Sequence, residues 1–210
     1  MRALLLSDSM ALPREEFSSD FPCYLGILER KFKCVEFYSL SLGKATLPDL
    51  VNQYDRYYQY FNPDIVIIHC GIVDCAPRAL KKWEQHLLGG LPLLGKKVYK
   101  YRKQLRRFRN ISYTSKTQFK YLLDYLQSKL GNNLVAISIA PPTAAYQKKV
   151  EGIIERVDAY NTLLKRIGNY VDLSEMPESC IGSDDYHFNH LGHEFVAHKL
   201  EEAINLILSK

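Results

Sequence analysis

The chain has 210 residues, of which 47% are hydrophobic and 12% aromatic, and its formal net charge is +5. A chain of this size and composition can bury a sizeable core by itself, which excludes a disordered protein. Its five cysteines include no Cys-x-x-Cys pair, so we expect neither a disulfide framework nor a zinc knuckle. We therefore predict a single globular domain over residues 1–210.

The first apolar run, within residues 1–7, is too short for a signal peptide or a membrane span, and it also suits a core strand. We therefore expect a cytoplasmic protein. A strand is predicted over residues 2–6, followed by an amphipathic helix over 13–31 with apolar side chains at three- to four-residue spacing. A second strand over 33–38 leads through a loop containing Gly43 to a helix over 47–61, and we expect the backbone at Gly43 to come close to another group.

The clearest strand covers residues 64–70, which are β-branched and apolar on both faces, as in a central parallel strand. A basic insertion at about 75–112 follows, in which we predict a helix; so long a connection is typical of a lid or a binding element. Ser115 or Thr117 caps a helix to residue 130, followed by a strand over 134–139, a helix over 150–167, a strand over 170–173 and a last helix from about His190. This alternation predicts a flavodoxin-like, three-layer α/β/α fold with a parallel sheet of about five strands.

Candidate catalytic residues stand near the two ends of the chain. Asp184 precedes His187 by three residues, and a carboxylate on one ring nitrogen of a histidine leaves the other free to take a proton. Ser9 follows the first predicted strand, and chemistry in open parallel sheets collects at the carboxyl ends of strands. A serine there is more often a turn residue than a nucleophile. We expect Asp185 to point away from His187, since successive side chains of an extended segment alternate, and Asp8 to bind backbone amides of the turn.

A metal site is the alternative use of His187, His190 and His193. Their spacing of three, without a cysteine or a separate set of acidic ligands, fits no common metal site well. We therefore predict no metal, and we place His190 and His193 at the start of the last helix with Asn189 as its cap.

In order and spacing, these segments resemble the motif blocks of the SGNH (GDSL-type) hydrolase family over nearly the whole chain. The family's Gly-Asp-Ser block matches residues 7–9 at two of three positions, and its second-block glycine matches Gly43. Its Gly-x-Asn-Asp block falls on residues 71–74, and its Asp-x-x-His block matches residues 184–187. We identify two departures from the family pattern: Ser7 replaces a glycine, and Asp74 stands where the family places an asparagine.

The resemblance implies an acyl-enzyme mechanism without a cofactor, in which Ser9 is the nucleophile, His187 the base and Asp184 its orienting acid. It also implies an oxyanion hole formed by the backbone N–H groups of Ser9 and Gly43 and a third donor at Asp74. An ionised carboxylate only accepts hydrogen bonds. Asp74 would therefore have to hold a proton, or be neutralised by a neighbouring cation such as Arg78.

The function implied by the resemblance is that of a serine esterase or acyl hydrolase acting on an oxygen ester, for example an acetylated carbohydrate or a lipid-type ester. One alternative is an O-acyltransferase that uses the same triad. Another is a catalytically weak SGNH fold that binds a carbohydrate or an anionic partner, and both departures from the family pattern favour it.

The positive charge is concentrated in one segment. Between Arg78 and Arg109 there are eleven Lys or Arg residues and one acid, Glu84, so this segment carries +10 and the remainder −5. Such a segment forms either a solvated helix face or, with its interleaved aromatic residues, a surface for an anionic polymer or membrane. No fold signature for nucleic acid accompanies it, so we expect none to bind. The cations predicted to contact substrate are Arg78, Lys96, Lys97, Lys100 and Arg102.

Overall fold

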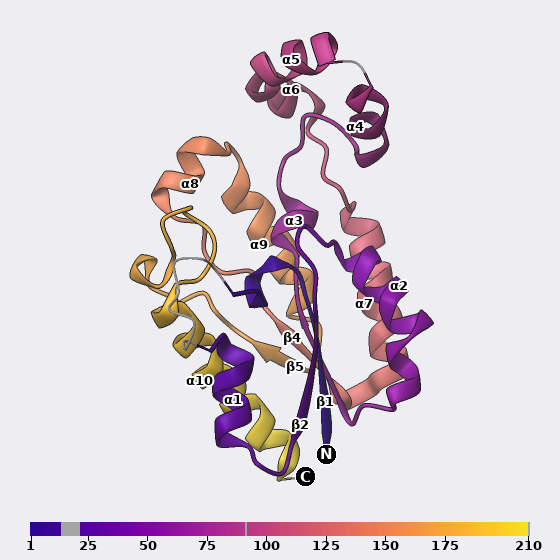
Figure 1. Cartoon of the computed structure of the whole chain (residues 1–210), viewed down its shortest axis with the longest axis vertical. Coiled ribbons are helices and arrows are strands. Elements are labelled where there is room, and N and C mark those ends of the chain that lie inside the picture. Colours follow the sequence, from indigo (N-terminus) through magenta and orange to yellow (C-terminus); the bar gives the residue numbers. More distant parts are fainter. Residues whose placement is uncertain (14–21, 91, 210) are drawn as a thin grey trace.

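In the computed structural model, which describes residues 1–13, 22–90 and 92–209, five parallel strands form one sheet (Figure 1). The strands are β1 (Arg2–Ser7), β2 (Glu36–Ser41), β3 (Ile65–His69), β4 (Leu134–Ile137) and β5 (Asn169–Val171). Their order is β2-β1-β3-β4-β5, which is the flavodoxin-like order. Helices cover both faces, so the predicted three-layer α/β/α fold is confirmed.

The two helical layers differ in their members. Helices α1 (Tyr24–Lys31) and α10 (His190–Leu208) pack together on one face, and α2 (Leu47–Arg56), α7 (Lys116–Leu130) and α9 (Ile153–Leu164) cover the other. The shorter α-helices are α3 (Ile72–Cys75), α4 (Lys82–Gly89), α5 (Pro92–Lys100), α6 (Arg102–Arg109) and α8 (Ala144–Lys149). The 3-10 helices are η1 (Ser9–Ala11), η2 (Tyr58–Phe61), η3 (Gly131–Asn133) and η4 (Glu178–Cys180).

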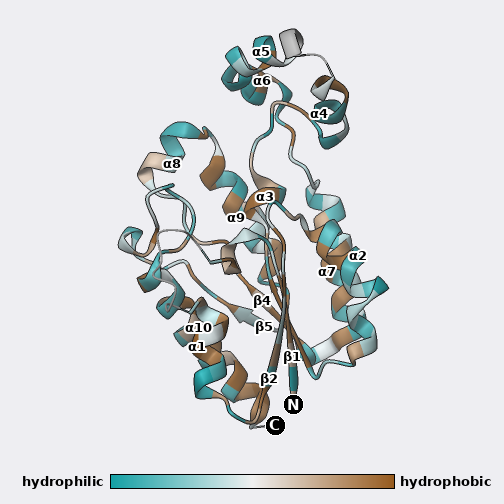
Figure 2. Ribbon diagram, viewed as in Figure 1, coloured by the Kyte–Doolittle hydropathy of each residue, from teal (hydrophilic) through white to brown (hydrophobic). Residues whose placement is uncertain are grey.

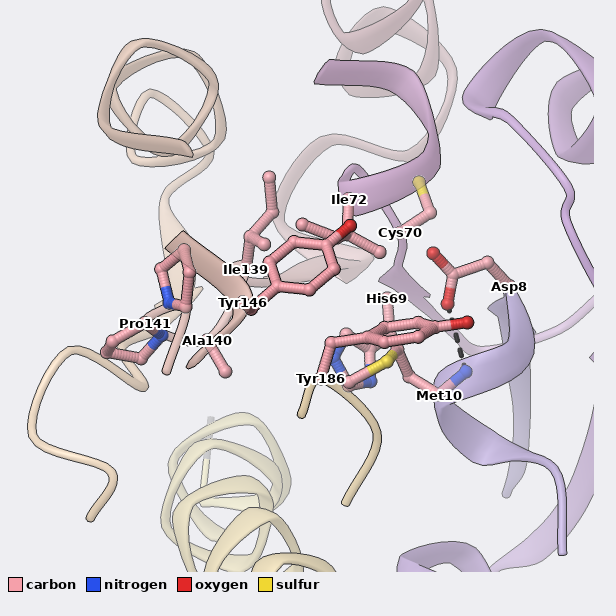
Figure 3. Close-up of a pocket in the computed structure, with 11 residues that line it drawn as sticks. Asp8, Met10, His69, Cys70, Ile72, Ile139, Ala140, Pro141, Tyr146 and Tyr186 are labelled. Carbon is pink, nitrogen blue, oxygen red and sulfur yellow. Dashed lines mark hydrogen bonds between the residues drawn. The ribbon is translucent and has the colours of Figure 1, made fainter. Parts of the chain in front are cut away.

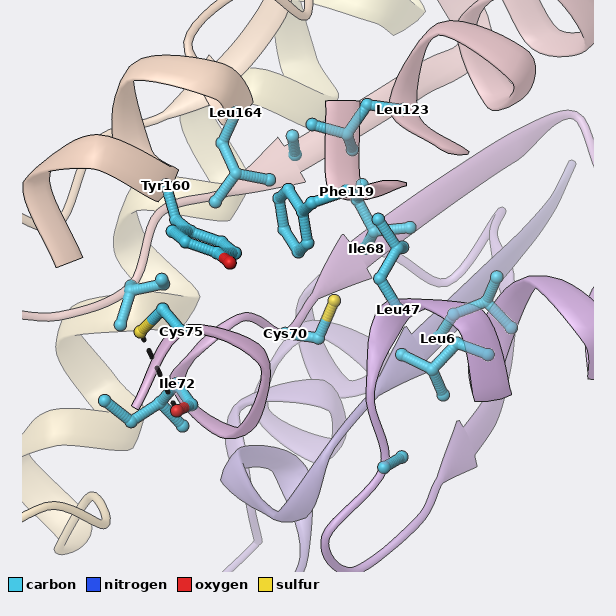
Figure 4. Close-up of a cluster of buried hydrophobic side chains, with 14 of the residues drawn as sticks. Leu6, Leu47, Ile68, Cys70, Ile72, Cys75, Phe119, Leu123, Tyr160 and Leu164 are labelled. Atoms are coloured by element: carbon cyan, nitrogen blue, oxygen red, sulfur yellow. Dashed lines mark hydrogen bonds between the residues drawn. The ribbon is translucent and has the colours of Figure 1, made fainter. Parts of the chain in front are cut away.

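Each central strand divides its side chains between two cores. In β1, Leu4 and Leu6 join the cluster beneath α2, α7 and α9, part of which Figure 4 shows, whereas Ala3 and Leu5 join the cluster beneath α1 and α10. Because both faces are covered, the central strands β1, β3 and β4 are almost entirely apolar, and the hydrophobic colour in Figure 2 runs along them. The packing on both faces fixes the carboxyl edge of the sheet, where the predicted catalytic residues lie.

Several predicted boundaries shift. The strand expected over 33–38 is β2, which begins three residues later; it is an edge strand with half-exposed side chains, so pairing with β1 sets its limits and hydrophobic alternation does not. The helix expected over 47–61 ends at Arg56 and is followed by η2. The helix expected over 13–31 is represented by α1, and residues 14–21 of that prediction lie outside the described residues.

Helices α4, α5 and α6 form an arm, residues 78–90 and 92–111, that projects beyond the carboxyl edge of the sheet (Figure 1). The helix predicted in this insertion is broken at Tyr101, which separates α5 from α6. The two ends of the arm are joined at its base, where the Arg78 N–H donates to the Ile111 carbonyl at 2.9 Å. The Arg109 guanidinium also binds both carboxylate oxygens of Glu84, at 2.6 and 2.7 Å. Within the described residues, no helix combines the length and apolar character needed to cross a membrane.

Candidate active site

Ser9 lies in a tight turn that follows β1 directly. The carboxylate of buried Asp8 accepts a hydrogen bond from the Met10 N–H at 3.0 Å, and the Asp8 N–H donates to the His69 carbonyl of β3 at 3.1 Å. Asp8 thus holds the turn through backbone amides, as expected from its position. The turn leaves the Ser9 side chain partly exposed at the carboxyl edge of the sheet.

His187 reaches Ser9 from the loop before α10. Its backbone carbonyl accepts the Gly182 N–H at 2.7 Å, which closes the loop over residues 182–187. Its ring Nδ1 binds one carboxylate oxygen of Asp184, and its Nε2 lies 2.8 Å from the Ser9 hydroxyl oxygen. The structure therefore joins the three predicted catalytic side chains in one hydrogen-bonded chain. With the proton of the neutral ring on Nδ1, Nε2 can accept a hydrogen bond from the Ser9 hydroxyl.

Asp184 is held as an anion at neutral pH. Its other carboxylate oxygen accepts the backbone N–H groups of Tyr186 at 3.3 Å and His187 at 3.0 Å. Burial acts to raise the pKa of Asp184, but the hydrogen bonds from the His187 backbone and ring outweigh it and keep this pKa below its ordinary value. An ionised carboxylate in this place stabilises an imidazolium on His187.

The neighbouring carboxylate faces another part of the molecule. Asp185 forms an ion pair with Lys149, and its carbonyl accepts the Thr143 hydroxyl at 3.0 Å. The expected separation of Asp184 and Asp185 is present, but the expected reason is wrong. The segment is a turn in which Asp185 has a φ of 75°, not an extended strand with alternating side chains.

The three histidines of the last block point to different places. His187 binds Ser9, His193 is buried with its Nδ1 3.3 Å from the Tyr24 N–H, and the His190 side chain is exposed at the first residue of α10. Asn189 caps α10, since its side chain accepts the Gly192 N–H at 3.1 Å. The three rings therefore do not converge on one point.

An apolar pocket opens beside Ser9, with the flanking residues Asp8 and Met10 in its wall (Figure 3). Two tyrosines that the sequence did not suggest form another part of that wall. The Tyr186 ring centroid lies 3.8 Å from that of His187, and Tyr146 packs on Tyr186 at 5.4 Å. Tyr186 lies in the Asp-x-x-His block, so the sequence could have indicated its place beside His187. Tyr146 lies on α8, a helix that no sequence pattern predicted.

Beneath the pocket lies His69, the last residue of β3. It is buried, its Nδ1 is 3.0 Å from the Tyr24 hydroxyl, and its ring stacks on Phe188. Burial lowers the pKa of His69 to about 3, with a further contribution from His193, so the ring is neutral at physiological pH. Because His69 ends the clearest predicted strand, the sequence could have indicated that it lines a pocket at the carboxyl edge of the sheet.

The glycines of the second and third blocks differ in what the fold requires of them. The loop containing Gly43 is tied to β1, because the Leu42 N–H donates to the Ser7 carbonyl at 3.0 Å. A Cβ added to Gly43 would meet none of the described residues within 4 Å, so the expected close approach at Gly43 is not made by any of them. Gly71 has a φ of 135°, and a Cβ there would lie 2.7 Å from the Ile139 side chain, so this position requires glycine.

Asp74 does not take the place expected for it in the oxyanion hole. It is fully buried, its two oxygens lie 3.0 and 3.2 Å from the Leu47 N–H, and the Thr114 hydroxyl also binds it. It therefore fastens the start of α2 to the segment after the arm. Counted from Gly71, the block Gly-x-Asn-Asp places its asparagine at Val73 and its aspartate at Asp74. The departure from the family pattern thus lies at Val73, whose side chain cannot donate a hydrogen bond.

Of the two expected ways of neutralising Asp74, the structure favours protonation over pairing with Arg78. Burial raises the pKa of Asp74 to about 6, although the bonds from Thr114 and Leu47 oppose that shift. Arg78 is not its partner: its guanidinium donates to the Val73 carbonyl at 3.0 Å and lies 4.3 Å from the Tyr113 ring centroid. Arg78 therefore supports the base of the arm.

The other cations predicted to contact substrate lie farther along the arm. Lys96, Lys97 and Lys100 are exposed on α5, and the Arg102 guanidinium lies 3.9 Å from the ring centroid of Tyr99. None of them is among the described residues that line the pocket beside Ser9.

No family model and no curated protein matches this chain significantly. Solved structures do. The chain is similar to a lipase/acylhydrolase from Enterococcus faecalis, with a TM-score of 0.69 and 14% identity over 97% of this chain and 94% of the other. It is similar to an acetylxylan esterase from Geobacillus stearothermophilus, with a TM-score of 0.64 and 14% identity over 97% and 93%.

A third similar structure is the esterase EstA from Pseudoalteromonas sp., with a TM-score of 0.59 and 12% identity over 100% of this chain and 99% of the other. The likeness extends over almost the full length of all these chains. The chain therefore has the three-layer α/β/α fold of the SGNH-type lipases and esterases, the family that its motif blocks resemble.

Proposed function

We propose that this protein is a serine esterase that cleaves an oxygen ester through an acyl-enzyme intermediate. The observation that carries the proposal is the chain of contacts from Ser9 to His187, at 2.8 Å, and from His187 to Asp184. A nucleophile, a base and a group that orients the base are the minimum set for acyl transfer to serine. Three structures of the same fold, a lipase/acylhydrolase and two esterases, bear names that agree with this chemistry.

The reaction follows from the positions of these atoms. His187 Nε2 removes the proton of Ser9 as Oγ forms a bond to the ester carbonyl carbon, and Asp184 stabilises the imidazolium that results. The tetrahedral intermediate then collapses, its bond to the alcohol oxygen breaks, and His187 returns the proton to the departing alcohol. Water, activated by the same nitrogen, attacks the acyl-Ser9 carbonyl and releases the acid and free Ser9.

The oxyanion donors in this proposal are backbone groups. The Ser9 N–H lies at the start of η1, and the open space beside Gly43 leaves room for a ligand atom near that loop. Val73 supplies no side-chain donor, and one such donor typically contributes about 10²–10³ in rate. We therefore propose a slower enzyme than one with a complete hole.

The pocket beside Ser9 suits the acyl half of the ester. Most of its lining is apolar, which favours an acyl group over a sugar or a charged group at that side. The apolar side chains that line it are Met10, Ile72, Ile139, Ala140, Pro141 and Pro142.

Labelling with a fluorophosphonate probe tests the proposal, because only an activated serine reacts. We expect the wild type to be labelled and to hydrolyse p-nitrophenyl acetate. Ser9→Ala and His187→Ala should each abolish labelling and lower kcat by at least about 10⁴-fold, with no additive loss in the double variant. Unchanged circular dichroism and Tm show that the variants fold. Robust hydrolysis by pure Ser9→Ala protein would refute the assignment, and labelling without hydrolysis of any ester would favour an acyltransferase.

We further propose that the outer surface of the arm contacts an anionic lipid surface. The aromatic side chains Phe108, Tyr99 and Trp83 are 89%, 67% and 59% exposed. Lys82 and Arg109 pair with Asp49 and Glu84, whereas the other nine cations of the arm form no ion pair with any described residue. Exposed aromatic rings among unpaired cations are the combination that binds the interface of an anionic membrane.

A further inference from the structure

A second hollow, of about 440 Å³, lies between the arm and the body of the domain. One wall is α6, and the other is the end of α8 with the beginning of α9. Six lining residues are cations: Lys103, Arg106, Arg107, Lys148, Lys149 and Arg156. Glu151 is the one acidic residue among the described lining residues. This hollow, which we call the basic hollow, is thus strongly positive.

Little of this charge is neutralised by the protein. Lys149 pairs with Asp185, and Arg156 donates to the carbonyls of Asn110 at 2.8 Å and of Cys75 at 3.4 Å. The other four cations form no ion pair within the part of the chain that the structure describes. Burial, followed by repulsion from Arg78 and Arg102, lowers the pKa of Arg106. Like charges gathered in this way repel one another, and a bound anion relieves that repulsion.

The composition of the hollow favours a phosphate group. Three of the six cations are arginines, whose planar guanidinium groups bind phosphate oxygens through two parallel hydrogen bonds. Arg156 is already held in place by its bonds to Cys75 and to Asn110 at the base of the arm, so its position is set before a ligand arrives. A volume of about 440 Å³ is within the usual range of sites for small organic ligands.

The basic hollow and the pocket beside Ser9 are neighbours that share α8. Tyr146 of this helix lines the Ser9 pocket, while Lys148 and Lys149 line the basic hollow. The Asp185 partner of Lys149 is next in the chain to Asp184 of the triad. Both sites therefore adjoin the same helix, α8, which Figure 1 labels and whose Tyr146 Figure 3 shows in the pocket. A substrate that uses both sites has to extend from Ser9 past this helix.

We propose that the basic hollow binds a phosphate group carried on the alcohol half of the ester that Ser9 cleaves. The substrate class is then an acyl ester of a phosphorylated alcohol. This inference rests on the proposed esterase function, because it assigns the two halves of one substrate to the two adjacent sites.

Binding is tested first, on the Ser9→Ala protein, so that no chemistry intervenes. We expect inorganic pyrophosphate to bind with saturation in isothermal titration calorimetry, and succinate to bind more weakly. The triple variant Lys103→Gln/Arg107→Gln/Lys148→Gln should weaken pyrophosphate binding at least about tenfold, since loss of even one charge-assisted hydrogen bond to the anion lowers affinity by about this factor. The matched triple Lys33→Gln/Lys165→Gln/Arg166→Gln removes the same charge at exposed sites elsewhere and should bind as the parent does. Absent saturation, equal binding of succinate, or equal weakening by both triples would overturn the proposal.

The wild-type enzyme is then compared on 1-acetylglycerol 3-phosphate and neutral 1-acetylglycerol. We expect kcat/KM to favour the phosphorylated ester by at least about tenfold, and the Lys103/Arg107/Lys148 triple variant to reduce that ratio to near one. Equal values for both esters in the wild type would overturn the inference while leaving the esterase proposal intact. Cleavage of neither ester, with pyrophosphate still bound, would instead refute the esterase function and the assignment of the phosphate to its substrate.

Discussion

The carboxyl edge of the sheet and the arm are built in opposite ways. At the carboxyl edge of the sheet, polar side chains are buried and hydrogen-bonded: Asp8 to Met10, His187 to Ser9, and Asp74 to Leu47. On the arm, several large apolar side chains are exposed to solvent, and Phe108 is 89% exposed. Its ends are fastened by the Arg109–Glu84 pair, while most of its charge has no partner within the described residues.

The difference corresponds to two kinds of task. Burial makes a misplaced polar group costly, so the geometry around Ser9 is determined by the fold before a substrate arrives. The exposed rings and most cations of the outer arm make few contacts within the described residues, so they are accessible to another molecule. We therefore expect substitutions at the edge of the sheet to act on chemistry or stability, and substitutions on the arm to act on binding.

The largest predicted effect is a difference in kcat between substitutions of two adjacent aspartates, Asp184 and Asp185. Asp184→Asn replaces the carboxylate that orients His187 with a group that also offers an N–H, which favours the wrong tautomer. We expect kcat for p-nitrophenyl acetate to fall by about 10³–10⁴. Asp185→Asn is the matched control, since Asp185 pairs with Lys149 and its φ of 75° is one that asparagine tolerates. Its kcat for the neutral ester should change by less than about threefold.

Steady-state kinetics on both variants at neutral pH, with Tm measured alongside, decides this comparison. Similar losses in the two variants would show that the catalytic contacts are not specific to Asp184. A fully active Asp184→Asn protein would mean that His187 does not act as the base in the way the geometry suggests.

The sequence predicts those parts of the site whose determinants are local. The chain from Leu4 to Asp8 and the spacing of Asp184 and His187 each lie within one short segment, and burial of β1 and β3 on both faces leaves a clear apolar pattern. The family resemblance supplied the pairing of Ser9 with His187, which are 178 residues apart. The hydrogen bond between them agrees with that expectation, while their catalytic roles stay predictions.

Features of the site that depend on contacts between distant segments, or on short elements, were not predicted from the sequence. The contacts of Asp74 depend on Leu47 from α2 and Thr114 from beyond the arm, and no local pattern around residue 74 indicates either. Helix α8 has six residues, too few to show a helical period, so Tyr146 and the wall it shares with the basic hollow were not anticipated. The break at Tyr101 likewise had no signal from glycine or proline.

Substitution of Asp74 tests whether a buried carboxylate at the edge of the sheet affects stability or catalysis. Its folded-state pKa of about 6 lies above the ordinary value of 3.8, so the folded state binds the proton more tightly than the unfolded state. Stability is therefore lost as the pH rises from about 4 to about 6, by on the order of 3 kcal/mol, and this cost is fully present above pH 6. Asp74→Asn should gain stability over the wild type by about this amount as the pH is raised, while its kcat stays within a few-fold.

Urea denaturation of both proteins at about pH 4 and pH 7 measures this difference. Asp49, at the same end of α2, is the control of opposite sign. Burial acts to raise its pKa, but bonds from Lys82 and Thr46 hold it below the ordinary value. Asp49→Asn should therefore lose stability relative to the wild type at neutral pH, and the loss should shrink as the pH falls. A stability difference for Asp74→Asn that does not vary with pH would contradict the raised pKa of buried Asp74. A large fall in kcat would instead support the original expectation that Asp74 contributes to the oxyanion hole.

The smallest expected effect concerns the outer surface of the arm. The Phe108 ring is almost fully exposed, so Phe108→Ala should leave Tm unchanged. The variant should co-sediment about three- to tenfold more weakly with vesicles of anionic lipid, because the ring is no longer buried in the membrane interface. Tyr60→Ala is the matched control, because that ring is 79% exposed but lies outside the arm. Binding of the wild type should also fall with added salt, since exposed charges are screened beyond about 8–10 Å at ordinary ionic strength. Equal loss in both variants, or no sedimentation at low salt, would refute the lipid surface. Salt-sensitive retention on an anionic polysaccharide, without vesicle binding and without an effect of Phe108→Ala, would show that the arm binds charge alone and that its aromatic rings have no part in it.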